Sequence, residues 1–232
     1  MIGVGGFFYR KITEQANVIC AMSLLNHKTL AALVFTTLFT LSCASGESEK
    51  GFKPLFNGKD QSGWHLRNPA GHQSWTIEPG GILKNTVNPG SHGTDLVSDQ
   101  KYWNFTVRYE YMTPKDSNSG FYLRGRHEIQ ILGDYESHEA SVGGNGAIYA
   151  FKAPDKFVTK PAGEWQTVEA TIVGHRITVV LNGVKIHDQV ECTKATGSEL
   201  DDKVNEPGSI FLQGDHGTVS FRNLRIKELP KD

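Results

Sequence analysis

Hydrophobic and polar residues alternate along most of the chain, in short runs separated by glycine, proline and asparagine. In NFTVRYEYM, residues 104–112, every second side chain is apolar, which is the pattern of a half-buried β-strand. TVEATIVGHRITVVLNGVKIHD predicts three more strands, joined at residues 174–176 and at Asn182-Gly183, because Asn-Gly between alternating runs favours a tight hairpin. After residue 50 no stretch has the period of an amphipathic helix.

So many short antiparallel strands predict an all-β sandwich or barrel. Two segments lack the alternation. TKATGSELDDKVNEP, residues 193–207, is polar, and we expect it to be a surface loop. GDYESHEASVGGNGAIYA, residues 133–150, is long and glycine-rich. Long loops in compact domains often carry function, so this second segment is expected to contribute to a site.

One stretch, GFYLRGRHEIQILGD at residues 120–134, combines the strand pattern with an unusual set of polar side chains. Side chains alternate between the two faces of a strand, so we expect one face to lie in the core with Phe121, Leu123, Ile129 and Ile131. The opposite face then carries Tyr122, Arg124, Glu128, Gln130 and Asp134. His127 lies beside the core positions and is expected to be buried or at an edge.

The closing strands repeat this arrangement in SIFLQGDHG. Ile210 and Leu212 are predicted to face the core, Phe211 and Gln213 the other side, and His216 follows at the strand end. Two separate segments therefore offer aromatic surfaces and hydrogen-bonding groups that suit sugar hydroxyls.

Alternation alone leaves three interpretations of this polar face open: a solvated face, a sugar-binding face or an active site. Ordinary roles also remain open for single residues. Arg124 can be a cross-strand partner of Glu128 or Glu110, and His216 before a glycine can be a turn residue.

Composition and charge remove several functional classes. The chain has 232 residues and a formal net charge of -1, which argues against nucleic-acid binding, because that function usually needs a basic surface. The sequence has no HExxH motif, no cysteine pair with metal-ligand spacing and no EF-hand loop, so it predicts no metal site. It has no dinucleotide fingerprint either, so it predicts no cofactor.

The first 43 residues predict an export signal rather than part of the fold. Lys28 precedes an apolar run, residues 29–41, that is too short to cross a bilayer comfortably and is followed by small residues. A start at Met22 would give a shorter and more typical signal, and the 21 residues before it would then be an upstream start artefact. Cys43 lies where a bacterial lipoprotein carries its lipidated cysteine, and residues 44–50 follow as a polar tether.

We therefore expect an exported protein of a bacterial cell envelope, whose folded domain spans residues 51–232 and meets a membrane only through a lipid on Cys43. The alternative is ordinary cleavage near Ala44 or Ser45, which gives a secreted protein. Cys192 is the only cysteine after this point, so the domain has no internal disulfide.

An ordered set of motifs makes the chain resemble a known family. The motifs are NSGFYLRGR with HEIQILGD, then GAIYAFKAP, then KPAGEWQTVEATIVGHRITVVLNGV, then GSIFLQGDHGTVSFRNLRIKEL, and the likeness runs from about Phe52 to Leu229. The chain is similar to the 3-keto-disaccharide hydrolase domain, whose members are commonly secreted or lipid-anchored bacterial proteins. The resemblance implies a concanavalin A-like jelly roll of two curved antiparallel sheets with a concave face for carbohydrate. It also implies a separate sugar oxidoreductase that supplies the 3-keto group.

The resemblance also assigns polar site residues. They are Asn118, Arg124, Glu128, Gln130, Asp134, Tyr149, Gln213 and His216. Tyr122 joins them as a substrate contact on strand parity, because an aromatic ring offers a flat surface to a sugar. The closing motif departs from the family's shorter spacing, since Gly214 and Asp215 both lie between Gln213 and His216.

These residues favour one reaction over another. Ordinary glycosidases need two carboxylates across the scissile bond, and Gln130, two residues after Glu128, cannot be the second. A 3-keto sugar has an acidic hydrogen on C2, so one base can remove it, the C1 substituent leaves by elimination, and water then adds. Glu128 is the expected base, Arg124 or Gln130 the stabiliser of the enolate oxygen, and His216 the acid for the leaving oxygen. The alternatives are a non-catalytic carbohydrate-binding domain and an ordinary glycosidase.

Replacing Cys43 with serine tests the predicted anchor. Serine cannot take the lipid, so we expect the wild-type protein to fractionate with membranes and the C43S variant to move to the soluble fraction, as followed by immunoblot. A wild-type protein that is already soluble and begins at Ala44 or later would show that the lipoprotein prediction is wrong.

Overall fold

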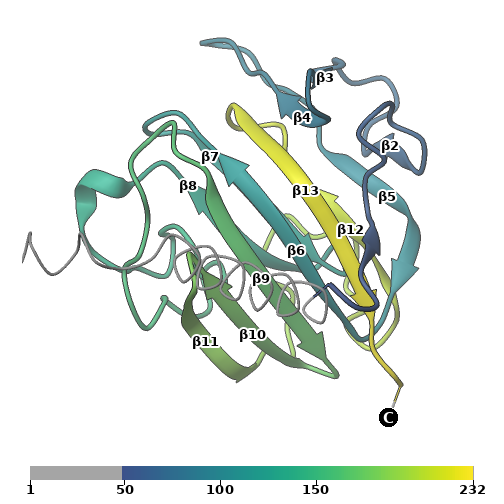
Figure 1. The fold of residues 1–232 in the computed structure, drawn as a ribbon, viewed down its shortest axis with the longest axis vertical. Helices are drawn as coiled ribbons and strands as arrows, with labels where there is room; N and C mark the ends of the chain where they lie inside the picture. The colour runs from purple at the N-terminus through teal and green to yellow at the C-terminus, as the bar shows by residue number, and fades with distance from the viewer. Residues whose placement is uncertain (1–48, 232) are drawn as a thin grey trace, which may run out of the picture. The chain divides into compact units, whose positions relative to one another are not determined.

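Two antiparallel β-sheets packed face to face form the part of the chain that this computed structural model describes, residues 49–231 (Figure 1). Apart from one short 3-10 helix, Tyr135–Ser137, every regular element in this part is a strand. The prediction of an all-β jelly roll is therefore confirmed. Within the same residues no helix is long and apolar enough to cross a membrane. The signal segment and Cys43 lie outside the described residues.

The larger sheet has eight strands (Figure 1). Its order is β11–β10–β9–β6–β13–β4–β3, and β1 also pairs with β13. The bounds are β1 Lys53–Pro54, β3 Trp75–Glu78, β4 Ile82–Asn85, β6 Phe105–Met112, β9 Gln166–Val173, β10 Arg176–Leu181, β11 Val184–Glu191 and β13 Val219–Glu228. The last strand of the chain thus joins the first hairpin, β3–β4, to the middle of the sheet.

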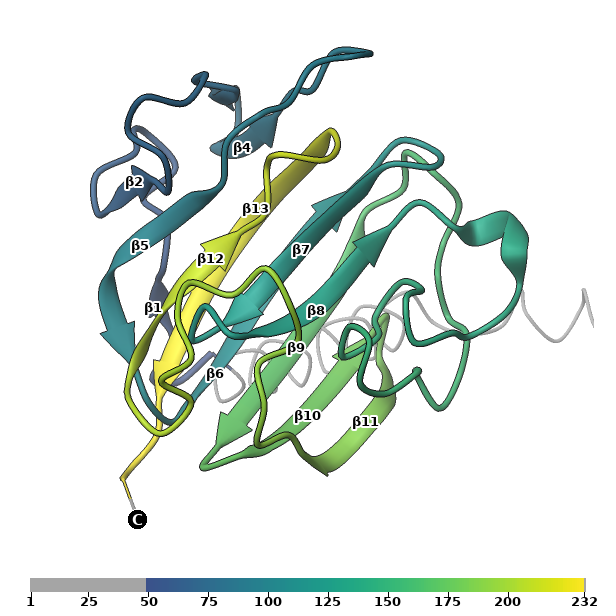
Figure 2. The same ribbon diagram turned by 180° about the vertical axis from the view of Figure 1, so that it is seen from behind.

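The smaller sheet has five strands and is seen from its own side in Figure 2. Its order is β2–β5–β12–β7–β8. The bounds are β2 Trp64–Leu66, β5 Leu96–Tyr102, β7 Asn118–Leu123, β8 His127–Leu132 and β12 Gly208–Leu212. Because β12 lies between β5 and β7, the segment that follows it, with Gln213 and His216, runs beside β7.

The core lies between the sheets and follows the alternation in the sequence. Tyr109 on β6 stacks on Phe121 on β7, with ring centroids 4.1 Å apart and planes 5° apart, so this pair joins the two sheets. The predicted inward-facing set is buried: Phe105, Val107, Tyr109, Tyr111, Phe121, Leu123, Ile129, Ile131, Ile210 and Leu212. His127 is buried as well, in line with its parity.

The Asn182-Gly183 pair forms the predicted tight turn between β10 and β11. Both residues have positive φ, 52° and 79°, as a hairpin turn that matches the strand twist requires. Asn182 also fastens the turn to its surroundings, because its Oδ1 accepts the Thr167 N–H at 3.0 Å and its Nδ2 donates to the Val158 carbonyl at 2.8 Å.

The outer face of the smaller sheet is covered rather than solvated. A second apolar cluster lies on it, formed by Val97, Tyr122 and Phe211 with Leu200 packed against them. Leu200 comes from residues 193–207, which form the predicted surface loop, and this loop packs on the sheet. It folds back on the sheet because Thr196 donates its N–H to the Arg126 carbonyl at 2.9 Å and Leu200 finds an apolar surface there.

The long loop after β8 is anchored by Asn145. Its Oδ1 accepts the hydroxyl of Tyr111, a core residue, at 2.7 Å. The loop then returns along β8, where Ile148 forms a bridge with Ile129. This path brings Tyr149 beside the outer face of the smaller sheet, so the loop contributes to that face as expected.

Candidate active site

A polar pocket lies on the outer face of the smaller sheet. Strands β7 and β8, the segment after β12, the loop after β8 and residues 193–207 all contribute to it. Its lining residues are Asn118, Tyr122, Glu128, Gln130, Tyr149, Ser198, Gln213 and His216. All of them except Ser198 are residues that the sequence predicted for the site, and their chemical roles stay predictions.

Glu128 is the only carboxylate among these lining residues, and it is 3% exposed. Tyr122, directly opposite it on β7, donates its hydroxyl to Oε2 at 2.7 Å. Gly120 makes room for the other oxygen, because a Cβ at this position would lie 2.2 Å from Oε1. The Tyr122 hydroxyl thus orients the carboxyl group of Glu128, and Gly120, also on β7, leaves the space that this carboxyl group occupies.

Burial raises the pKa of Glu128 from 4.5 to about 7. The Tyr122 hydrogen bond and the positive charge of His216 act in the opposite direction, whereas the charges of Asp215 and Asp95 add to the rise. Burial outweighs the two stabilising contacts because the ionised carboxylate loses its water. Such a group can both take and return a proton near neutral pH.

Tyr122 contributes its hydroxyl and not its ring. The ring is fully buried and stacks on Phe211, with centroids 4.1 Å apart and planes 19° apart. The expectation that Tyr122 gives a flat surface to a sugar is therefore wrong, because Phe211 and the sheet cover the ring. Burial and the charge of Glu128 raise the pKa of Tyr122, so its hydroxyl stays protonated and donates to Glu128.

Three amide side chains, those of Asn118, Gln130 and Gln213, complete the polar lining. Their carboxamide oxygens are buried and have no hydrogen-bond partner within the described residues. Gln130 is oriented by its Nε2, which donates to the Gly143 carbonyl at 3.2 Å. Buried polar atoms in proteins are nearly always hydrogen-bonded, so these three acceptors are available to water or to the hydroxyl groups of a ligand.

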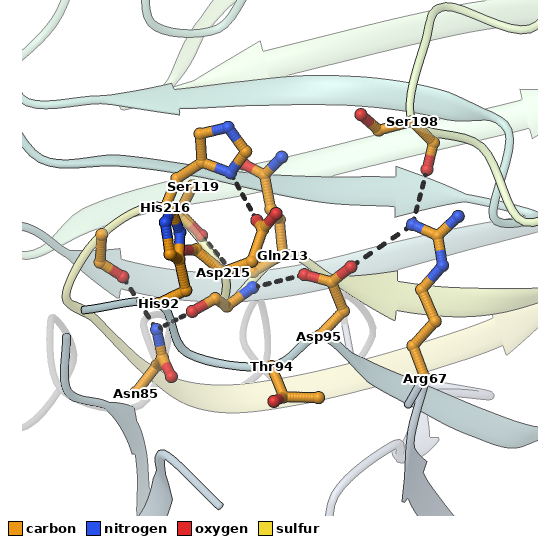
Figure 3. A network of polar contacts seen from close by, with 12 residues as sticks. Arg67, Asn85, His92, Thr94, Asp95, Ser119, Ser198, Gln213, Asp215 and His216 are labelled. Carbon is orange, nitrogen blue, oxygen red and sulfur yellow. Dashed lines mark hydrogen bonds and ion pairs between the residues drawn. The ribbon is translucent and has the colours of Figure 1, made fainter. Parts of the chain in front are cut away.

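His216 lies at the exposed side of the pocket, with a side chain that is 49% exposed. Its Nδ1 is paired with the carboxylate of Asp215, as Figure 3 shows. A carboxylate at Nδ1 fixes the proton there and leaves Nε2 to act on a ligand. One of the two residues that separate Gln213 from His216 is therefore the partner of His216.

Arg124 does not line the pocket, so the prediction that it stabilises charge there is wrong. With Gly125 it forms the turn between β7 and β8, where both residues have positive φ, 56° and 66°. The turn directs its guanidinium over the ring of Trp103, 3.6 Å from the centroid, and its Nε donates to the Trp103 carbonyl. Within the described residues it pairs with neither Glu128 nor Glu110.

Asp134 does not line the pocket either, so its prediction as a substrate contact is wrong. Its Oδ2 accepts the Asn145 N–H at 2.9 Å, which fixes the start of the loop that carries Tyr149. The residue thus supports the site from outside. Among residues 49–231, no three His, Cys, Asp or Glu side chains are grouped so that they could hold a metal ion.

The sequence did not reveal Ser198 or Asp95. Ser198 lies in a polar segment without alternation, so no local pattern marks it. Asp95 precedes β5 and is 7% exposed, and its Oδ1 accepts the Gly214 N–H at 2.9 Å. Burial raises its pKa. The only local signal is an acidic residue directly before an apolar run, which is too common to indicate a site.

Comparison with known proteins gives a consistent set of relatives. Residues 51–227 match a family described as the 3-keto-alpha-glucoside-1,2-lyase-like domain. A protein of Bacteroides thetaiotaomicron named 3-keto-disaccharide hydrolase is 28% identical, and the alignment covers 77% of this chain and 79% of that protein.

Solved structures from Parabacteroides distasonis share the fold. One protein described as a glycosyl hydrolase is 26% identical with a TM-score of 0.63, over 78% of this chain and 84% of that one. A second with the same description is 24% identical with a TM-score of 0.64, over 80% and 97% of the two chains. The second likeness supports the two-sheet fold alone.

Replacing Gly120 with alanine tests how Glu128 is fixed. The added Cβ would overlap Oε1, so we expect a crystal structure of the variant to show the carboxyl moved away from the Tyr122 hydroxyl. The side chain is flexible, so the melting temperature should fall by no more than about 4 °C, which corresponds to about 1 kcal/mol. A carboxyl that keeps its contact with Tyr122 would contradict this explanation of Gly120.

Replacing Glu128 with glutamine tests the raised pKa through stability. The folded pKa lies above the unfolded one, so the wild type loses stability as pH rises through about 7. At pH 8 we expect Glu128→Gln to be more stable than the wild type by on the order of 3 kcal/mol, and the difference to vanish below about pH 4. Urea unfolding at the two pH values measures it, with the exposed Glu139→Gln as control. Equal stabilities at pH 8 would mean that Glu128 is not destabilised by burial.

Proposed function

Because the chain belongs to the 3-keto-alpha-glucoside-1,2-lyase-like domain family, we propose that it cleaves the glycosidic bond of 3-keto-glycosides, including 3-keto-disaccharides. One observation carries the proposal: the pocket holds a single carboxyl, Glu128, whose pKa of about 7 suits a general base. The name of the Bacteroides relative, 3-keto-disaccharide hydrolase, supports the substrate class.

The proposed reaction is an elimination followed by a hydration. A ketone at C3 makes the hydrogen on C2 acidic, and the Glu128 carboxylate takes this proton to leave an enolate with its charge on the C3 oxygen. The enolate expels the oxygen on C1, which leaves with a proton, and a C1–C2 double bond forms. Water then adds its oxygen to C1 while Glu128 returns the proton to C2, so the product is the free 3-keto sugar.

The other lining residues have complementary roles in this proposal. The amide of Gln130 has a second N–H besides the one donated to Gly143, and this N–H stabilises the enolate oxygen. His216 protonates the leaving oxygen through Nε2, since Asp215 keeps the other ring nitrogen occupied. The unpartnered oxygens of Asn118 and Gln213 accept hydroxyl protons of the sugar.

An ordinary glycosidase mechanism is less well supported. It needs two carboxyl groups on either side of the scissile bond. Glu128 has the only carboxyl group among the lining residues. The nearby buried carboxylate of Asp95 is hydrogen-bonded to the Gly214 N–H and paired with Arg67. An elimination needs only one carboxylate, so it fits the pocket better.

A non-catalytic carbohydrate-binding domain is also less well supported. Such a domain gains affinity from hydrogen bonds and from exposed aromatic rings. Tyr149 offers one such ring to the pocket, whereas the ring of Tyr122 is covered. A binding domain gains nothing from a buried carboxyl with a raised pKa, which lowers stability at neutral pH. Groups with strongly shifted pKa values in pockets are typical of enzymes.

The proposal requires a partner enzyme. Glu128 and His216 can move protons, but they cannot remove a hydride from C3, so a separate sugar oxidoreductase has to make the ketone. The predicted lipid on Cys43 would keep this protein at the cell envelope, where we expect it to meet its oxidised sugar substrates.

Deuterium exchange at C2 tests the base. With 3-keto-trehalose in deuterium oxide, we expect Glu128→Gln to bind the sugar but to lose both exchange and cleavage by about 10²- to 10⁴-fold, because general-base catalysis contributes about that much. Nuclear magnetic resonance follows the C2 hydrogen, and Glu139→Gln controls for the loss of one negative charge. Exchange at the wild-type rate in Glu128→Gln would rule Glu128 out as the base and make His216 the next candidate.

A further inference from the structure

Arg67 lies outside the pocket but contacts one of its walls. Its Nη1 donates to the Ser198 carbonyl and its Nη2 to the Glu199 carbonyl, both at 2.9 Å. Ser198 lines the pocket and has a φ of 52°, a conformation that residues with a Cβ keep only when the surroundings fix it. The guanidinium supplies two parallel hydrogen bonds at this point, so it stabilises the wall in a strained position.

Asp95 connects Arg67 to the opposite wall (Figure 3). Its Oδ2 lies 3.3 Å from Nη1 of Arg67, and its Oδ1 accepts the Gly214 N–H at 2.9 Å. Gly214 lies between Gln213 and His216, both of which line the pocket. One ion pair therefore joins two segments that lie on different sides of the pocket and come from distant parts of the chain.

Arg67 also contacts Phe211, the ring that stacks on the lining residue Tyr122. Its guanidinium carbon lies 5.3 Å from the ring centroid of Phe211, within the range of a cation–π contact. Phe211 stacks on Tyr122, whose hydroxyl donates to Glu128. The same side chain thus touches the layer that orients the proposed base.

We propose that Arg67 and Asp95 form a clamp that sets the distance between the Ser198 wall and the His216 wall and so positions both against Glu128. The inference rests on the proposed function. Both are positioning residues, since neither lines the pocket. Lysine cannot replace Arg67 in the clamp, because a single ammonium group lacks the planar fork that reaches two successive carbonyls and a carboxylate.

The clamp also affects the charge state of Glu128. The titratable groups that face Glu128 are Tyr122, His216, Asp215 and Asp95. The Asp95 carboxylate acts to raise the pKa of Glu128, and Arg67 and the Gly214 N–H fix it where it does so. Removing this charge should make Glu128 ionise at lower pH.

Arg67→Lys tests the mechanical part of the clamp. We expect faster amide hydrogen exchange in residues 193–201 and 213–217 together, measured by mass spectrometry. We also expect kcat on a 3-keto-glycoside to fall about 10- to 100-fold, more than KM rises, because misplacement by about 1 Å costs rates of that order.

Arg222→Lys is the matched control. Arg222 also pairs with a carboxylate, Glu110, and also lies over an aromatic ring, Trp165, at 4.0 Å. It belongs to β13 of the larger sheet, away from the pocket, so exchange in the two segments and kcat should stay at wild-type values.

Asp95→Asn tests the electrostatic part. The amide oxygen of asparagine can still accept the Gly214 N–H, but the negative charge is gone. We expect the acid limb of the kcat/KM profile, and the titration of the Glu128 carboxyl by carbon-13 magnetic resonance, to shift to lower pH. Glu110→Gln, which removes the carboxylate of the control pair, should leave both unchanged.

Exchange and carboxyl titration need no turnover, so failure of the clamp and failure of the proposed function are separable. Faster exchange in both segments of Arg67→Lys would support the link between the two walls. If the wild type then failed to cleave 3-keto-glycosides, only the proposed function would be contradicted. Wild-type exchange in either segment would overturn the clamp, and so would an equal loss of kcat in Arg222→Lys. If Arg67→Lys does not fold, the same exchange measurement on Asp95→Asn decides.

Discussion

A carboxyl group buried with no arginine or lysine beside it, among residues 49–231, is the constraint on which the rest of the site depends. Burying an ionised carboxylate is costly, and an arginine beside Glu128 would reduce the cost but lower its pKa and make it a weak base. The protein uses neutral contacts instead: the Tyr122 hydroxyl donates to one oxygen, and Gly120 leaves space for the other. Arg124, four residues before Glu128, is directed away by its place in a turn, and Arg126, two residues before it, pairs with Asp201.

The inner faces of the sandwich form the core, and the outer face of the smaller sheet carries the site. The inner faces of the two sheets form a core in which the stacked Tyr109 and Phe121 join the layers. The outer face of the smaller sheet places Glu128 and Gln130 on a rigid strand, whereas His216 comes from a connecting segment. Connecting segments need extra contacts to stay in place, and here Asp95 supplies them by accepting the Gly214 N–H and pairing with Arg67.

Strand alternation predicted an all-β sandwich or barrel and part of the site, and the family resemblance supplied the jelly roll and the remaining site residues. Parity placed Glu128 and Gln213 on one face because side chains alternate strictly along a flat strand. Parity failed at Arg124, where Arg-Gly starts a turn with positive φ and the alternation ends. Ser198 and Asp95 were out of reach, because only tertiary contacts bring their segments to the pocket. For Tyr122 the predicted strand face was correct, but the predicted contact between its ring and a sugar was wrong, since Leu200 and Phe211 cover the ring.

The chemistry of the bond cleavage is the central claim, and one measurement tests it most directly. Purified wild-type protein is incubated in deuterium oxide with 3-keto-trehalose and, separately, with unoxidised trehalose, and the products are followed by mass spectrometry. An elimination through Glu128 predicts cleavage of the oxidised sugar alone, with deuterium at C2 of the released 3-keto sugar. Cleavage of unoxidised trehalose at a similar rate, or a 3-keto product without deuterium, would contradict the account.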